Sequence, residues 1–77
     1  MEWKDYPRNK PQKNGNYLIS LKEPINKKDY YFYSFIARYD SAFDKWYQFD
    51  PISKNEFTNP IAVEIIGWMK LPPTFLG

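Results

Sequence analysis

Ile65-Ile66-Gly67-Trp68-Met69-Lys70-Leu71-Pro72-Pro73 is the stretch that decides the fold of this chain. An apolar run that ends at two prolines is typical of a β-strand, because proline has no N–H to donate to a neighbouring strand. A glycine inside such a run indicates a β-bulge or a close approach of another backbone segment. The stretch therefore predicts a strand over residues 62–71, with Gly67 at an irregular point of a curved sheet.

Three further segments predict strands. Tyr17, Ile19 and Leu21 alternate with other residues and predict a strand over residues 17–21 with one buried face. Residues 30–39 form the longest candidate strand, central or strongly curved, because both of its faces begin with aromatic side chains. Residues 45–49 complete a hairpin through a polar connection at 40–44. The predicted fold is mainly β: a small twisted antiparallel four-stranded meander or half-barrel with at most one short helical turn, near residues 53–57.

The chain length of 77 residues predicts a single small β domain spanning residues 1–77. Residues 1–16 are polar and rich in turn formers, which predicts an extended N-terminal arm packed on the domain. Trp3 and Tyr6 are the residues that we expect to attach this arm. We assign a structural role to Trp3, Ile66, Trp68 and Leu71.

Composition excludes much catalytic chemistry. Neither histidine nor cysteine occurs, so the chain offers no Ser-His or Cys-His pair and no Cys/His zinc site. The three glycines are far apart and form no phosphate-binding loop. A Mg²⁺ or Ca²⁺ site built from Asp40, Asp44 and Asp50 is an alternative, but aspartate is typical of turns at such positions. We therefore predict no enzymatic activity, no cofactor and no metal.

Charge and hydropathy give further expectations. The 11 basic and 9 acidic residues leave a net charge of +2, which is too small to indicate nucleic acid. No window reaches the roughly 18 apolar residues that a membrane span needs, and the first residues do not resemble a signal peptide. These features predict a cytoplasmic protein without a membrane partner.

The aromatic content predicts binding. The 3 Trp, 7 Tyr and 6 Phe residues exceed what a small core can hide, and tyrosine and tryptophan are enriched at binding hot spots. We predict Arg38, Tyr39, Trp46 and Tyr47 as the binding residues of a non-catalytic protein-binding module. An exposed edge strand would also pair with another chain, which makes a homo-oligomer an alternative assembly.

Two alternatives remain open. The aromatic residues 30–33, with Trp46 and Tyr47 and with Lys22, Arg38 and Lys45 nearby, resemble a base-stacking platform for single-stranded nucleic acid. The small net charge makes that partner less favoured, and a small ligand in a half-barrel mouth is the second alternative. The cations of the N-terminal arm would steer an acidic partner by long-range attraction; they are Lys4, Arg8, Lys10 and Lys13.

The order of short motifs resembles a known family. Trp3 is followed by Pro11 and Gly15, Tyr39-Asp40 precedes Trp46 across a short turn, and the chain ends with Trp68-Met69-Lys70-Leu71-Pro72. This order resembles domain-of-unknown-function family 551, which comprises small proteins of phages and prophages. The resemblance implies a phage origin and a small β fold, and it implies no activity. It leads us to expect an accessory protein in the cytoplasm of a bacterial host that binds, and as an elaboration inhibits, a host or defence protein.

Overall fold

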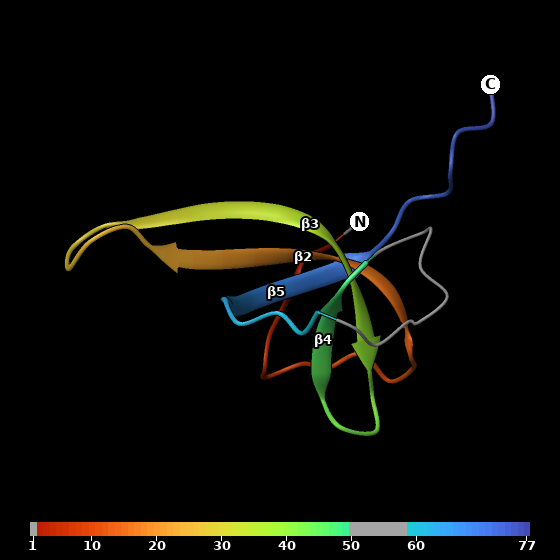
Figure 1. Ribbon diagram of the computed structural model, residues 1–77. Coiled ribbons are helices and arrows are strands. Elements are labelled where there is room, and N and C mark those ends of the chain that lie inside the picture. The colour runs from red at the N-terminus through yellow and green to blue at the C-terminus, as the bar shows by residue number, and fades with distance from the viewer. Residues whose placement is uncertain (1, 50–58) are drawn as a thin grey trace.

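The computed structural model describes residues 2–49 and 59–77, and its strands form one antiparallel sheet (Figure 1). In chain order the strands are β1 (Lys4–Asp5), β2 (Gly15–Pro24), β3 (Tyr30–Asp40), β4 (Lys45–Gln48) and β5 (Glu64–Lys70). The described residues contain no helix, and the helical turn expected near 53–57 lies outside them. The prediction of a mainly β, twisted antiparallel fold is confirmed.

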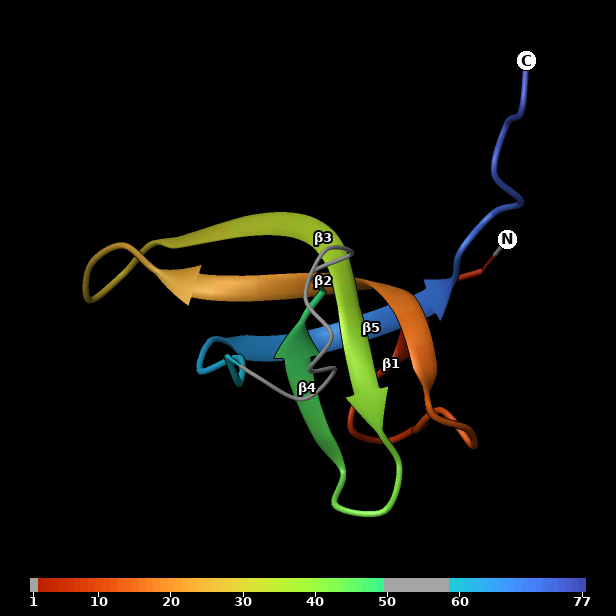
Figure 2. The ribbon, with the colours of Figure 1, turned by 45° about the vertical axis from the view of Figure 1, so that its right-hand side comes forward.

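The order of strands across the sheet is β1-β5-β2-β3-β4, which adds two details to the prediction. β2, β3 and β4 follow one another as a meander, but β5 returns to pair with the free side of β2 (Figure 2). This return has a physical reason: Gly67, Trp68 and Met69 are all buried, and a strand buried on both faces belongs inside a sheet. The fifth strand, β1, has only two residues, and it covers the other side of β5.

Gly67 marks the irregular point that the sequence predicts. Ser20 pairs with Gly67 but Leu21 pairs with Ile65, so that Ile66 is an extra residue and β5 carries a bulge. Gly67 is also a point of close approach, because a Cβ atom there would lie 3.2 Å from the carbonyl oxygen of Lys4. Both interpretations of the glycine are therefore correct.

The core lies on one face of the sheet. Ile19 and Leu21 of β2 are completely buried, which confirms the inward face predicted for that strand. Residues opposite each other in an antiparallel pair share a face, so the partners of this row on β3 and β5 also point inward. The resulting cluster consists of Ile19, Leu21, Ala37, Tyr39, Trp46 and Trp68.

The β2–β3 ladder extends beyond the rest of the sheet as a hairpin (Figures 1 and 2). β4 pairs only with residues 37–40 of β3, and β5 pairs with β2 only as far as Lys22. We call the part of the ladder beyond β4, residues 18–36, the hairpin arm. The molecule is correspondingly elongated, with extents of 40 × 27 × 25 Å.

Candidate functional site

The four binding residues predicted from the sequence do not form one surface. They make two cross-strand pairs between β3 and β4, in which Arg38 faces Tyr47 and Tyr39 faces Trp46. Tyr39 and Trp46 are only 1% and 5% exposed, and their rings pack at a centroid distance of 4.5 Å. The prediction is wrong for these two residues, because strand alternation points them into the core. Arg38 and Tyr47 lie on the opposite face and are half-buried.

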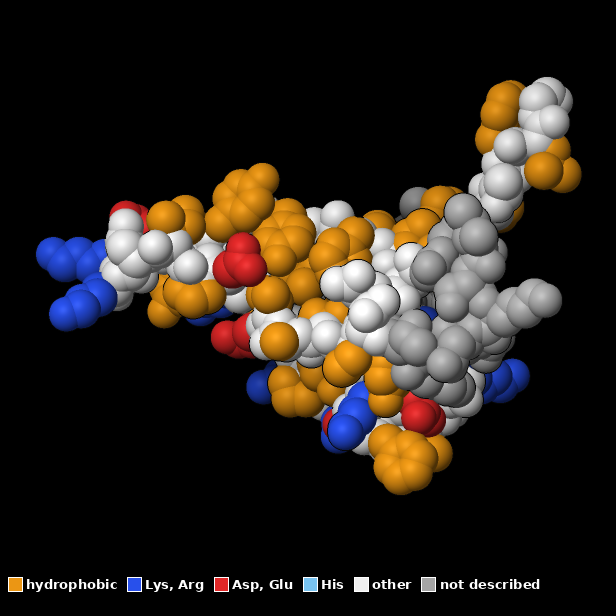
Figure 3. Space-filling view, viewed as in Figure 1, with side chains coloured by type: hydrophobic (Ala, Val, Ile, Leu, Met, Phe, Trp, Pro, Cys, Tyr) orange, Lys and Arg blue, Asp and Glu red, His pale blue; other side chains and the backbone are white. Residues whose placement is uncertain are grey.

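Three consecutive exposed aromatic residues lie instead on the hairpin arm. Tyr30, Tyr31 and Phe32 are 48%, 57% and 58% exposed, although they are consecutive and so lie on both faces of β3. Figure 3 shows hydrophobic side chains along this arm, with basic side chains at its tip. The tip carries Lys27 and Lys28.

One face of the arm carries an ordered row of rings. Tyr31 stacks on Tyr33 with a centroid distance of 5.4 Å and an interplanar angle of 27°, and Phe35 follows at 6.0 Å. We call Tyr31, Tyr33 and Phe35 the aromatic row. On the other face, the ammonium of Lys22 lies 4.1 Å from the ring centroid of Tyr30. The rings are thus held in place by one another and by a cation.

The sequence contains the signal for this arm. Both faces of β3 begin with aromatic residues. A strand of that kind is either covered on both faces by its own domain, or its aromatic side chains are exposed and a partner can contact them. The interpretation as a central strand holds only for residues 37–40 of β3, which lie between β2 and β4. Residues 30–36 protrude, because β4 is too short to reach them.

A groove of about 610 Å³ lies where the N-terminal arm crosses β5. None of the described residues that line this groove is acidic, and five of them are basic. Lys10 is neutralised by Asp44, and the ammonium of Lys4 lies over the Trp68 ring at 5.4 Å. We call this the basic groove; its lining residues are Lys4, Arg8, Asn9, Lys10, Gln12, Lys13, Tyr17, Trp68 and Lys70.

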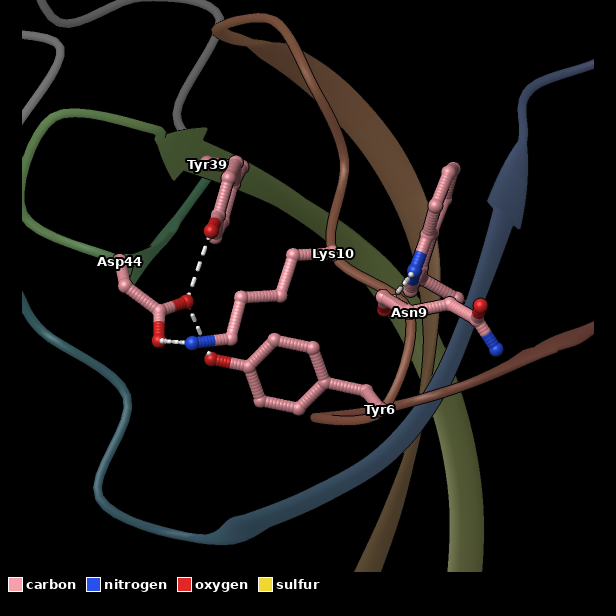
Figure 4. A network of polar contacts seen from close by, with 6 residues as sticks. Tyr6, Asn9, Lys10, Tyr39 and Asp44 are labelled. Atoms are coloured by element: carbon pink, nitrogen blue, oxygen red, sulfur yellow. Dashed lines mark hydrogen bonds and ion pairs between the residues drawn. The ribbon is translucent and has the colours of Figure 1, made fainter.

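Asp44 joins the N-terminal arm to the β3–β4 turn (Figure 4). The hydroxyls of Tyr6 and Tyr39 donate to its Oδ1 at 2.6 and 2.7 Å, and the ammonium of Lys10 lies 2.7 Å from its Oδ2. Tyr6 also packs edge-on against Trp46, which confirms the expected attachment of the arm by Tyr6.

The pKa values of this network follow from its contacts. Burial and the hydrogen bond to Asp44 raise the pKa of Tyr6 to about 12, and the same two causes raise the pKa of Tyr39. Burial acts to raise the pKa of Asp44, but the contacts from Lys10, Tyr6 and Tyr39 outweigh burial and lower it. The charged carboxylate and the neutral phenols are therefore the stabilised forms.

The two described acidic residues considered for a metal site, Asp40 and Asp44, have other roles. Asp40 Oδ1 accepts a hydrogen bond from the backbone N–H of Ala42 at 3.1 Å, which is the expected turn chemistry. Both carboxylate oxygens of Asp44 are used as described above, and Asp50 lies outside the described residues. Over residues 2–49 and 59–77, no group of three metal-ligating side chains comes together.

Comparisons with known proteins give no match: no family model, no curated protein and no solved structure is similar to this chain. The resemblance to domain-of-unknown-function family 551 therefore stays a prediction. Within the described residues, no helix is long and apolar enough to cross a bilayer.

Proposed function

We propose that this chain is a non-catalytic protein-binding module whose contact surface is the hairpin arm. The observation that supports the proposal is the half-exposure of Tyr30, Tyr31 and Phe32 on a protruding two-stranded arm. In the biological setting expected from the sequence, the module is a phage or prophage accessory protein in the bacterial cytoplasm. Its partner is a host or phage protein, and inhibition of a defence protein is an elaboration of this proposal.

The hairpin arm has the physical properties of a binding hot spot. Large rings supply apolar contact area, and tyrosine adds a hydroxyl that can form a hydrogen bond at the rim of an interface. The stacking within the aromatic row orders these rings before any partner binds. Less side-chain entropy is then lost on association, which favours affinity.

The proposal is tested by comparing the partner affinity of a hairpin-arm variant with that of a control variant. The purified chain is used to capture proteins from nuclease-treated bacterial lysate, and the captured protein is then titrated by calorimetry. The double variant Tyr31→Thr/Phe32→Thr removes two exposed rings and keeps β-forming residues. We expect it to lose at least about 10-fold in affinity, because hot-spot rings contribute this much or more.

Phe43→Thr is the matched control, because Phe43 is 73% exposed but lies in the β3–β4 turn. This variant is expected to bind as the unmodified chain does. If the arm variant keeps full affinity while folded, the contact surface lies elsewhere and the proposal is wrong.

The basic groove favours a second candidate, which is binding to single-stranded nucleic acid. Lys4, Arg8, Lys13 and Lys70 line the groove and form no ion pair with the described residues. Four phosphate contacts would give a log–log salt dependence of affinity with a slope of about −3. The test is a titration of a labelled oligothymidine at several salt concentrations, with Lys13→Glu/Lys70→Glu as the groove variant and Lys27→Glu/Lys28→Glu as the control.

The two candidates make different predictions for the same oligonucleotide. Binding that is lost in the groove variant and falls steeply with salt would favour nucleic acid. Absence of binding at low salt would exclude this candidate and leave the protein-binding proposal unchanged.

A further inference from the structure

The outer edge of β3 is open along the hairpin arm. β4 pairs with residues 37–40 only, so among the described residues no strand lies beside Tyr30–Ile36 on the side away from β2. This open edge is seven residues long, which exceeds the length of β4 itself. A free strand edge of this length is a template for pairing with another strand.

The backbone groups that point outward at this edge can be identified. The carbonyl of Trp46 accepts from the N–H of Ile61, and the N–H of Gln48 donates to the carbonyl of Asn59, so both β4 residues bond away from β3. Hydrogen-bonded and non-bonded pairs alternate in an antiparallel ladder. It follows that the even-numbered residues of β3 bond toward β4, and that beyond β4 the same parity faces the open edge. These outward-facing residues are Tyr30, Phe32, Ser34 and Ile36.

The open edge lacks the features that usually prevent pairing. Tyr30–Ile36 contains no charged residue and no proline, and its register with β2 is continuous, without a bulge. The other two edges of the sheet are treated differently. Residues 59–61 bond to the outer side of β4, and β1 ends the sheet with only two residues.

We propose that a second copy of this chain pairs with the open edge of β3 and forms a continuous sheet across a two-fold axis. The two β3 strands run antiparallel, with the axis passing perpendicular to the sheet at Tyr33. Tyr33 is the central residue of the seven, so an axis at this point pairs every residue of one edge with a residue of the other edge. The pairs are Tyr30 with Ile36, Tyr31 with Phe35, Phe32 with Ser34, and Tyr33 with its own symmetry mate.

Three properties favour a second copy as the occupant of the edge. The stretch is uncharged, so self-pairing places no like charges opposite each other. A two-fold axis perpendicular to the sheet keeps the aromatic rows of both copies on one face, where they lie side by side with Tyr31 of each copy opposite Phe35 of the other. A two-stranded hairpin is also marginally stable alone, and pairing would give each arm a third strand. Pairing uses backbone groups and leaves the ring faces exposed, so dimer formation does not depend on the proposed function.

Sedimentation velocity over a range of concentrations is the first test. We expect a monomer–dimer equilibrium with a Kd of about 1–100 µM, as is usual for modest interfaces. Ser34→Pro removes one outward N–H without removing a bond to β2, and it is expected to weaken the dimer at least about 10-fold. Ser34→Thr keeps the N–H and is the matched control, which is expected to dimerise as the unmodified chain does. Circular dichroism of each variant establishes that it is folded.

Thiol cross-linking tests the register, and it is specific because the chain has no cysteine. In the proposed register a thiol introduced by Tyr33→Cys faces its own symmetry mate, with the Cα atoms about 4.5 Å apart in a non-bonded pair. That separation suits a disulfide. A thiol introduced by Tyr31→Cys would lie about 13 Å from its mate, four residues along the strand, and is the control.

The outcomes separate clearly. A disulfide dimer formed by Tyr33→Cys and not by Tyr31→Cys supports the proposal, whether or not Ser34→Pro folds. A monomer at all concentrations, a folded Ser34→Pro variant that dimerises normally, or equal cross-linking at both positions would overturn it. A monomer that still captures a protein through its exposed rings would overturn only the dimer, and would leave the open edge to a strand of that foreign protein.

Discussion

Asp44 connects three parts of the chain through one carboxylate. It binds Tyr6 and Lys10 of the N-terminal arm and Tyr39 of β3. Its φ of 52° lies in the left-handed region, which aspartate and asparagine tolerate better than most residues. The residue therefore serves both the backbone of the turn and the attachment of the arm.

Substitution of Asp44 separates these two roles. Asp44→Ala leaves two phenols and an ammonium without their acceptor in a left-handed turn, and is expected to lower the free energy of unfolding by about 2–3 kcal/mol. Asp44→Asn keeps the turn preference and one oxygen acceptor, so a loss of about 1 kcal/mol is expected. Urea denaturation measures both, with Glu2→Gln as an exposed control of equal charge change. An alanine variant as stable as the control would show that the network does not contribute to stability.

Trp68 and Trp3 provide a comparison between a buried and a half-exposed tryptophan. Trp68 is 5% exposed, its indole N–H donates to the carbonyl of Asn9 at 2.8 Å, and its ring packs edge-on against Tyr17. Trp68→Ala is expected to lower the free energy of unfolding by about 3–5 kcal/mol, which is most of the stability of so small a domain. Trp3 is 49% exposed, and Trp3→Ala is expected to lower it by only about 1 kcal/mol. Similar thermal melts for the two variants would contradict this assignment.

At the level of the strands, alternation predicts much of the fold and little of the surface. The inward row of β2 follows directly from Ile19 and Leu21, and the β3–β4 hairpin follows from its polar connection. β1 was not predictable, because its two residues are held by a pairing with the distant β5. The burial of Tyr39 and Trp46 was not predictable, because alternation cannot say which face of a strand is covered. That depends on how far β4 and β5 extend beside the β2–β3 ladder.

Gly67 tests the contact between β1 and β5. Gly67→Ala places a Cβ atom 3.2 Å from the carbonyl oxygen of Lys4, so the β1 backbone must move away. We expect a loss of about 1 kcal/mol in the free energy of unfolding, because the displacement outweighs the usual benefit of replacing glycine in a strand. Hydrogen exchange should accelerate most at the N–H of Tyr6, which bonds to Ile66.

Gly15→Ala is the matched control for this substitution. Its Cβ atom would meet only the ring of Tyr17, at 3.4 Å, and a side chain can adjust more easily than a backbone. The control should keep its stability to within about 0.5 kcal/mol. If both variants behave alike, the close approach of β1 does not constrain position 67.

At the scale of the whole molecule, contacts of the N-terminal arm connect distant parts of the sheet. Besides the Asp44 network, the carbonyl of Asn9 binds Trp68, and Asn14 Oδ1 accepts from the N–H and hydroxyl of Ser41. The arm thus joins β5 to the β3–β4 turn, two regions that do not pair with each other in the sheet. The hairpin arm takes no part in these contacts. The contacts of the N-terminal arm and the exposed rings of Tyr30, Tyr31 and Phe32 are therefore located in different parts of the molecule.

The shifted pKa values of the Asp44 network predict how the free energy of unfolding depends on pH. The pKa of Tyr6 is raised to about 12 and that of Tyr39 is also raised, so their contribution is complete below about pH 10, where unfolded tyrosine begins to ionise. The contribution is lost as pH rises further, because the unfolded chain releases these protons first. The pKa of Asp44 is lowered, so its contribution is complete above about pH 4 and is lost as pH falls through the folded value.

We therefore expect the free energy of unfolding from urea titrations to be nearly constant between about pH 4 and 10 and to fall on both sides. The variant Tyr6→Phe/Tyr39→Phe removes both phenols and should have a lower plateau and a shallower alkaline decline. Phe43→Thr, which changes an exposed ring outside the Asp44 network, should keep the alkaline decline of the unmodified chain. An equally steep decline in the double variant would mean that other groups control alkaline unfolding. The Asp44 network would then have no part in the response to high pH.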